Sequence, residues 1–103
     1  MFKKLVPVII TLAVSSCTSL SNEGANVLLV DANIQLPKDC SFIRYVESAA
    51  AQDDLSSSFE VAKIRLRNEA GKESANYVVI TKKSEGIFPG SGVIGGKAYR
   101  CII

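Results

Sequence analysis

The chain of 103 residues contains no histidine and no tryptophan. The absence of histidine removes the side chain that most often acts as a general base and the usual partner of a catalytic serine. It also removes a common zinc ligand, and structural zinc sites usually need four cysteine or histidine ligands. We therefore expect a protein that is not an enzyme and that carries no cofactor and no metal.

Two short patterns resemble a dinucleotide-binding turn and a calcium site, but neither meets the requirements of such a site. Residues Gly90–Gly95 match the glycine spacing of a dinucleotide-binding turn, but that turn must lead into a helix, and only eight residues, which read as strand, follow Gly95. We expect a flexible hairpin loop there instead. Asp53 and Asp54 offer too few oxygens for calcium, which prefers six to eight, so a solvated acidic pair is expected.

The chain also has little net charge, formally +2. Two of its twelve basic residues, Lys3 and Lys4, and none of its ten acidic ones lie in the first 16 residues, so ten of each remain after residue 16. A nucleic-acid partner requires a basic surface. Balanced charge therefore argues against nucleic acid and against a purely electrostatic role at a membrane.

The N-terminal residues have the pattern of an export signal. Lys3 and Lys4 precede the apolar run Leu5–Val14, whose ten residues are too few for a membrane-spanning helix of about 20. The sequence Val-Ser-Ser-Cys ending at Cys17 resembles the bacterial lipobox, which implies cleavage after residue 16 and a diacylglyceryl group on Cys17. The alternative is an ordinary signal peptide with an incidental cysteine.

The lipobox resemblance implies a location and a domain plan. Because Thr18 and not aspartate follows Cys17, the protein is expected on the outer membrane, with its domain facing the periplasm. Residues 1–16 would form the signal peptide, and residues 17–26 the lipidated cysteine and a short flexible tether with an r.m.s. span of about 15–18 Å. Residues 27–103 would form a single domain.

Two cysteines remain besides Cys17, namely Cys40 and Cys101. In an oxidising compartment an even pair indicates a disulfide, which stabilises a domain whose core is small. It would hold the last strand, with Ile102 and Ile103, against the sheet. A redox or metal site is the alternative.

The apolar patterns predict a helix and four strands. Ser57 and Glu60 fit a capping box at the start of a helix. From residue 59 onward, the apolar residues recur with the period of one helical face. The strands are predicted at 27–36 with an interruption near residues 31–33, and at 42–46, 76–81 and 96–103. Residues 49–55 are predicted as a loop, and residues 82–95 as a long mobile loop. The order β-β-α-β-β indicates a small two-layer α+β domain with a mainly antiparallel sheet and one helix on one face.

The predicted helix presents two faces. Phe59, Ala62, Leu66 and Ala70 form a narrow stripe suited to packing on the sheet. The opposite side carries Val61, Ile64 and Asn68, which are either scattered surface residues or a partner surface. An exposed ion pair between Arg65 and Glu69 is expected on the flank.

Three blocks, at residues 66–70 (LRNEA), 75–79 (ANYVV) and 98–101 (AYRC), together carry a family likeness. They resemble a family of small bacterial lipoproteins with a domain of unknown function, over residues 27–103. That family is distantly similar in fold to the outer-membrane lipoprotein that senses envelope stress for the Rcs phosphorelay. The family commonly has glycine before the Ala-Asn block, where a helix ends in a left-handed cap, whereas this chain has Ser74.

The resemblance implies a non-catalytic lipoprotein that serves as an interaction or envelope-maintenance module. Its partners would be membrane lipid, through acylated Cys17, and an envelope protein. The alternatives are an envelope-stress sensor of the Rcs-like type and a small-ligand or metal-binding module. The oligomeric state is left open.

Overall fold

A computed structural model of the chain describes residues 19–102. The predicted signal peptide and Cys17 lie outside the described residues. The elements are, in chain order, η2 (Gly24–Asn26), β1 (Leu28–Asp31), β2 (Cys40–Ala51), α1 (Leu55–Lys72), β3 (Tyr77–Glu85) and β4 (Ser91–Cys101).

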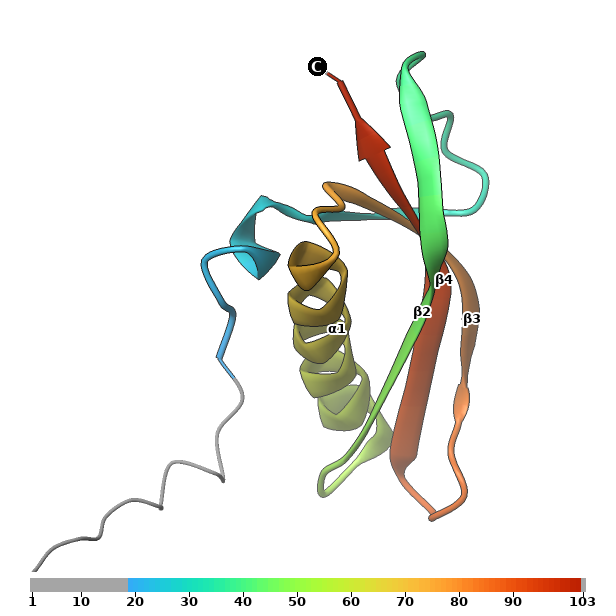
Figure 1. The fold of residues 1–103 in the computed structure, drawn as a ribbon. Helices are drawn as coiled ribbons and strands as arrows, with labels where there is room; N and C mark the ends of the chain where they lie inside the picture. The colour runs from blue at the N-terminus through green and yellow to red at the C-terminus, as the bar shows by residue number, and fades with distance from the viewer. Residues whose placement is uncertain (1–18, 103) are drawn as a thin grey trace, which may run out of the picture.

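The strands form one sheet in the order β1-β3-β4-β2, and α1 covers one of its faces (Figure 1). β1 runs parallel to β3, and the pairs β3–β4 and β4–β2 are antiparallel. The predicted class, a small α+β domain with one helix packed on a mainly antiparallel sheet, is confirmed.

The core lies between α1 and the covered face of the sheet. On α1, Ala62, Leu66 and Ala70 are fully buried, as the stripe predicted, and Phe59 is half-buried at its start. Small side chains on both layers allow helix and sheet to approach closely. The buried hydrophobic residues of this core are Val27, Val46, Ala50, Ala62, Leu66, Ala70, Ala75, Val78, Ile94 and Ala98.

The helix begins earlier than the capping-box pattern indicated. Asp54 is the N-cap residue, and its Oδ1 accepts the Ser57 N–H at 2.8 Å. A carboxylate at this position satisfies a free backbone donor of the first turn. The capping role predicted for Ser57 is therefore wrong, whereas Asp53 and Asp54 are both exposed, as expected of a solvated pair.

Residues 82–95, predicted as a long mobile loop, form most of the hairpin between β3 and β4. Residues 82–85 pair with residues 92–95, so the predicted mobile loop is mostly strand and its turn spans only residues 86–90. Gly92 is required by the packing, since a Cβ there would lie 2.8 Å from Cδ1 of Phe59. Gly96 faces the Val79 carbonyl oxygen so closely that a side chain would force the strands apart. Glycines that indicated flexibility in fact permit close approach.

β1 and β2 also differ from their predicted bounds. β1 ends at Asp31, because the chain turns there and the Ile34 N–H donates to the Asp31 carbonyl. The strand predicted over residues 27–36 is therefore too long. β2 is longer than predicted, because Ala49–Ala51 pair with residues 91–93 of β4. The alanines indicated helix or loop locally, but the partner strand provides the backbone hydrogen bonds that decide their conformation.

Candidate functional site

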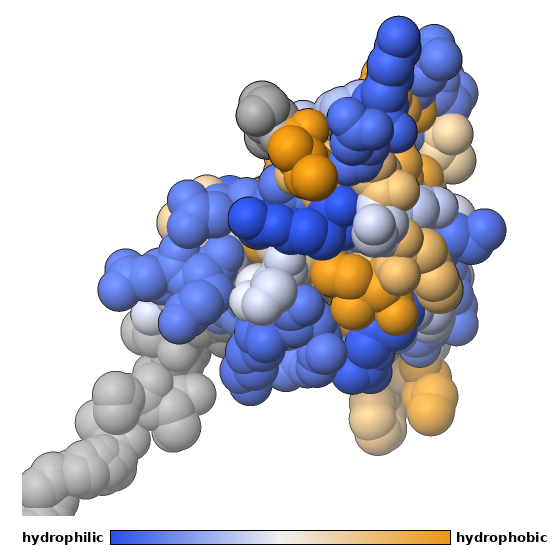
Figure 2. Space-filling view, turned by 45° about the horizontal axis from the view of Figure 1, so that its top comes forward, coloured by the Kyte–Doolittle hydropathy of each residue, from blue (hydrophilic) through white to orange (hydrophobic). Residues whose placement is uncertain are grey.

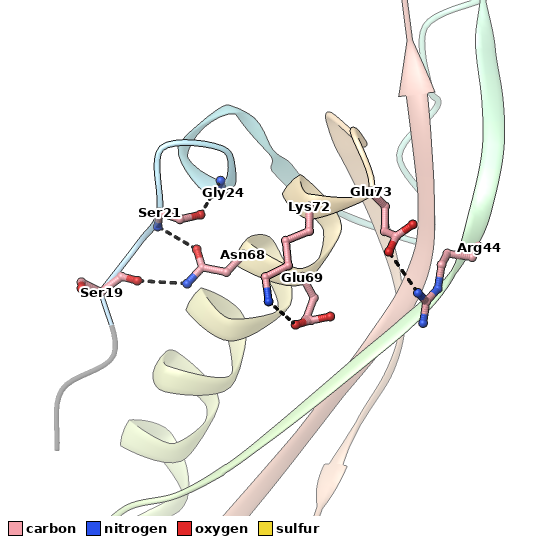
Figure 3. A network of polar contacts seen from close by, with 8 residues as sticks. All are labelled: Ser19, Ser21, Gly24, Arg44, Asn68, Glu69, Lys72 and Glu73. Carbon is pink, nitrogen blue, oxygen red and sulfur yellow. Dashed lines mark hydrogen bonds and ion pairs between the residues drawn. The ribbon is translucent and has the colours of Figure 1, made fainter. Parts of the chain in front are cut away.

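Asn68 of α1 makes two hydrogen bonds to the N-terminal segment. The Oδ1 atom of Asn68 accepts the Ser21 N–H at 2.8 Å, and its Nδ2 donates to the Ser19 carbonyl at 2.9 Å (Figure 3). The Ser21 hydroxyl in turn accepts the Gly24 N–H at 2.9 Å. Asn68 therefore holds the chain from the first residue that the structure describes.

Two glycines allow this segment to lie directly on the helix. A Cβ at Gly71 would lie 2.6 Å from the carbonyl carbon of Glu23, and one at Gly24 would collide with the Asn68 side chain. Because α1 has glycine at position 71, η2 contacts the helix backbone itself. Such backbone contact is possible only for residues without a side chain.

Arg67 completes the attachment. Its Nε donates to the Val27 carbonyl at 2.9 Å, and its Nη2 to the Ala25 carbonyl at 3.4 Å. Val27, which follows η2, is almost fully buried in the core. The prediction of a flexible tether through residue 26 is therefore wrong for residues 19–26. Sequence spacing alone could not reveal it, because the bonds join residues 40 or more positions apart.

The predicted partner surface on α1 is used by the chain itself. Asn68 binds residues 19 and 21, Val61 packs against the core, and Ile64 lines a small surface hollow beside Leu28 and Leu29. The three residues are brought together on one side of the helix as predicted. Asn68 and Val61 thus make contacts within the domain, but all three residues stay partly exposed, so a partner surface on this side of α1 stays a prediction.

A shallow polar groove separates the attached segment from β2. Its volume is about 510 Å³, and Arg65, Asn68, Glu69 and Lys72 of α1 form one wall. Glu69 pairs with Lys72 at 3.3 Å, and Arg65 donates to the Ala49 carbonyl at 2.8 Å. The groove is open to solvent, so these interactions contribute little to stability.

An exposed ion pair closes the end of the same region. Nη1 of Arg44 on β2 lies 3.2 Å from Oε2 of Glu73, the C-cap residue that follows α1 (Figure 3). Pairs of this exposure are worth about 0–1 kcal/mol. The contact places β2 and the C-terminal end of α1 side by side without fixing them strongly.

The face of the sheet opposite α1 carries a row of large side chains. Register places Phe42, Tyr99, Tyr77 and Leu28 side by side, one from each strand, and the rings of Phe42 and Tyr99 meet edge to face at 5.7 Å. Phe42 is 58% exposed and Leu28 54% exposed. We call these four residues the aromatic row.

Strand alternation shows that the aromatic row points away from α1. Val78 and Ala98, the next residues along β3 and β4, form a pair that is fully buried under the helix. Neighbouring residues of a strand point to opposite faces. No described element covers the face that carries the aromatic row.

Polar groups follow the aromatic row along the same face. Oε1 of Glu47 accepts a hydrogen bond from Tyr45 Oη at 3.0 Å and another from Lys82 Nζ at 3.3 Å. Partial burial, and then the hydrogen bond and negative charge of Glu47, raise the pKa of the Tyr45 phenol above its ordinary value. Tyr45 therefore stays protonated and serves as a donor at neutral pH.

The disulfide lies at the edge of this face. Cys40 and Cys101 are register partners on β2 and β4, with Cα atoms 3.9 Å apart, and the structure joins them. The Asn76 side chain binds both backbone groups of Cys101. Its Nδ2 donates to the Cys101 carbonyl at 2.7 Å, and its Oδ1 accepts the Cys101 N–H at 2.7 Å. The predicted bridge is present, and the two bonds from Asn76 were not foreseen.

The end of the chain is held through its backbone. The Ile102 N–H donates to the Asp39 carbonyl at 2.9 Å, but the Ile102 side chain is exposed. Ile102 is therefore held as expected, through its backbone and not through its side chain. Ile103 lies outside the described residues.

Within residues 19–102 no helix is both long enough and apolar enough to cross a membrane. In the same part of the chain, no group of three or more His, Cys, Asp and Glu residues could hold a metal ion. Figure 2 shows a mostly hydrophilic surface on which hydrophobic residues form separate small patches.

Comparisons of the chain with protein-family models, with curated proteins and with solved structures give no match. The resemblance to a lipoprotein family therefore stays a prediction.

Proposed function

We propose that the protein is a non-catalytic lipoprotein of the bacterial outer membrane, anchored through acylated Cys17, whose domain binds an envelope protein in the periplasm. The lipobox pattern supports the anchor. The binding role rests on one structural observation, the uncovered aromatic row on a sheet whose other face is packed against α1.

The composition of this face suits a protein partner. Interface centres are rich in tyrosine and phenylalanine, and their rims are polar. Here Phe42, Tyr77 and Tyr99 provide the apolar centre, and the Glu47–Lys82 pair provides an adjoining polar rim. The sheet orders the backbone of these residues before binding, so no backbone entropy of a flexible loop is lost on association.

The attachment of residues 19–26 determines where this face would act. Only Thr18 separates Cys17 from Ser19, so their Cα atoms can lie at most about 7 Å apart. Since Asn68 holds Ser19 on the domain, an acylated Cys17 would keep the whole domain against the membrane surface. A partner would therefore be a protein exposed at that surface, and a signalling protein in that position would make the chain a stress sensor.

Site-specific photo-cross-linking in intact cells tests the proposal. A photoreactive phenylalanine analogue at Phe42 should give an adduct with one envelope protein, and the same analogue at Lys63, on the outer side of α1, should not. Mass spectrometry identifies the partner, and an analogue placed on that partner should return the cross-link. Adducts at Lys63 alone, or none at Phe42, would refute the binding face.

A further inference from the structure

The turn between β3 and β4 exposes two large hydrophobic side chains. Ile87 is 95% exposed and Phe88 69% exposed, and Pro89 follows them. Residues 86–92 contain no charged side chain. Exposed apolar residues at the end of a hairpin gain nothing from the fold of the domain, so their position calls for an external contact.

Hydrogen bonds hold the backbone of this turn in a defined conformation. The Gly86 N–H donates to the Ser91 carbonyl at 2.9 Å, and the Ser91 N–H donates to the Phe88 carbonyl at 3.0 Å. Gly90, with a φ of 82°, donates to Oε2 of Glu85 at 2.9 Å. Ile87 and Phe88 are thus presented by a closed hydrogen-bonded turn.

A second set of bonds fixes the turn to the helix. The buried Ser58 hydroxyl donates to the Gly90 carbonyl at 2.5 Å and accepts the Gln52 N–H at 2.8 Å. An apolar hollow of about 340 Å³ adjoins the turn and includes Ile87, Phe88 and Val93 in its lining. The turn is therefore bonded directly to the first turn of α1.

Both the turn and the segment next to the predicted anchor are bonded to α1, so the helix sets the distance between them. Gly90 is bonded to Ser58 and Ser19 to Asn68, and these two helix positions are ten residues, or about 15 Å, apart. The chain outside the described part contains Cys17, within about 7 Å of Ser19. In Figure 1 the turn lies at the lower end of the sheet, and the C-terminus lies at the opposite end.

We propose that Ile87 and Phe88 insert into the lipid bilayer that holds the acylated Cys17, so that the domain touches its membrane at two points. This inference rests on the proposed lipid anchor. An uncharged and apolar tip enters the interfacial region without a charge to desolvate. Lys82, Lys83 and Glu85 flank the turn in sequence, Asp53 lies near Gly90, and Arg65 lines the adjoining hollow. These charges are of mixed sign, so insertion is hydrophobic and insensitive to salt.

The absence of tryptophan from the sequence provides a direct test. The full lipidated protein carrying Phe88→Trp is reconstituted into vesicles of phosphatidylethanolamine and phosphatidylglycerol, with and without bromine on the acyl chains. Bromine quenches indole only inside the bilayer. We expect a blue-shifted emission for Phe88→Trp and a loss of fluorescence in brominated vesicles, both unchanged by high salt.

Phe42→Trp is the matched control, because Phe42 has a similar exposure but lies beside the disulfide on β2. Its emission should be the same in both kinds of vesicle. Equal emission of Phe88→Trp with and without bromine contradicts the inference and places the tip in water or on a protein. A blue shift that needs no lipid and grows with protein concentration would also contradict it, and would indicate a second copy of the chain.

Flotation of the same samples separates the two proposals. Protein that floats with the vesicles but shows no quenching of Phe88→Trp retains its anchor and refutes only the inserted tip. Protein that does not float refutes the anchor, and the tip inference fails with it. Thermal melts of both variants check that the domain is folded.

Discussion

Asn68 and Ser21 lie 47 positions apart in the chain and are joined by a hydrogen bond of 2.8 Å from the Ser21 N–H to the Asn68 Oδ1. With the bond from Asn68 to the Ser19 carbonyl, this contact makes residues 19–26 part of the domain. A lipid on Cys17 would thus be attached almost directly to a folded structure. The mature protein would have no flexible arm with which to reach across the periplasm.

Replacing Asn68 should release this segment. Asn68→Ala removes two hydrogen bonds, which should lower the free energy of unfolding by about 1–3 kcal/mol and speed hydrogen exchange in residues 19–26. Asn68→Asp keeps the acceptor for Ser21 and loses the donor to Ser19, so it should have an intermediate effect. The control is Asn33→Ala in the exposed turn after β1. Unchanged exchange in residues 19–26 of Asn68→Ala would show that the segment is held by other contacts.

Loss of the disulfide should destabilise the domain strongly. The bridge closes a loop of 61 residues, and its removal should cost about 2–5 kcal/mol, a large part of the stability expected for a domain of this size. Thermal melts with and without reductant measure the effect, and the double variant Cys40→Ser/Cys101→Ser should match the reduced protein. Two free thiols in protein isolated under oxidising conditions, or a melting temperature indifferent to reductant, would contradict the bridge.

Ser74→Gly should stabilise the protein. Ser74 has a φ of +67°, the left-handed region, which costs a residue with a Cβ about 1–2 kcal/mol. Glycine avoids most of that cost but has a more flexible unfolded state, so a net gain of about 1 kcal/mol is expected. Ser84→Gly, on the exposed part of β3, is the matched control and should destabilise by about 0.5–1 kcal/mol. Chemical denaturation measures both, and a loss of stability in Ser74→Gly would contradict the left-handed assignment.

The N-cap of α1 predicts a dependence on pH. The backbone hydrogen bond from Ser57 lowers the pKa of the Asp54 carboxyl below its ordinary value of 3.8. A group with a depressed folded-state pKa contributes stability that is fully present above the unfolded-state value and is lost as the pH falls through the folded-state value. Asp54→Ala should therefore lower the melting temperature at about pH 7, and the difference from the parent protein should narrow at about pH 2. Asp53→Ala removes the same charge without the cap, and should not reproduce this pattern.

Local signals were sufficient for the helix and for the fold class. The stripe of Ala62, Leu66 and Ala70 has the helical period, and all three residues are buried. The glycine-rich stretch was predicted wrongly as a mobile loop. Gly92 and Gly96 are needed because Phe59 and Val79, which are distant in sequence, lie too close for a side chain there. Glycine permits both a flexible loop and a close contact, and only the neighbouring elements decide between them.

The candidate site was the hardest part to predict. Predicting the aromatic row would require the strand order and the register, because its four residues come from four different strands. Asn68 was singled out by its place on the helix, but its partners at positions 19 and 21 were assigned to a tether. Polar contacts of such long separation have no periodic signal in a single sequence.

Lipid attachment at Cys17 is the central claim, because the location, the orientation of the domain and the inserted tip all depend on it. Its most direct test is metabolic labelling with a radioactive fatty acid, comparing the parent protein with Cys17→Ser, together with mass spectrometry of the mature N-terminus. We predict label and a diacylglyceryl mass on Cys17 in the parent protein, and a longer, unlabelled chain for Cys17→Ser. Label that persists in Cys17→Ser, or a mature parent protein that carries no lipid, would contradict the account.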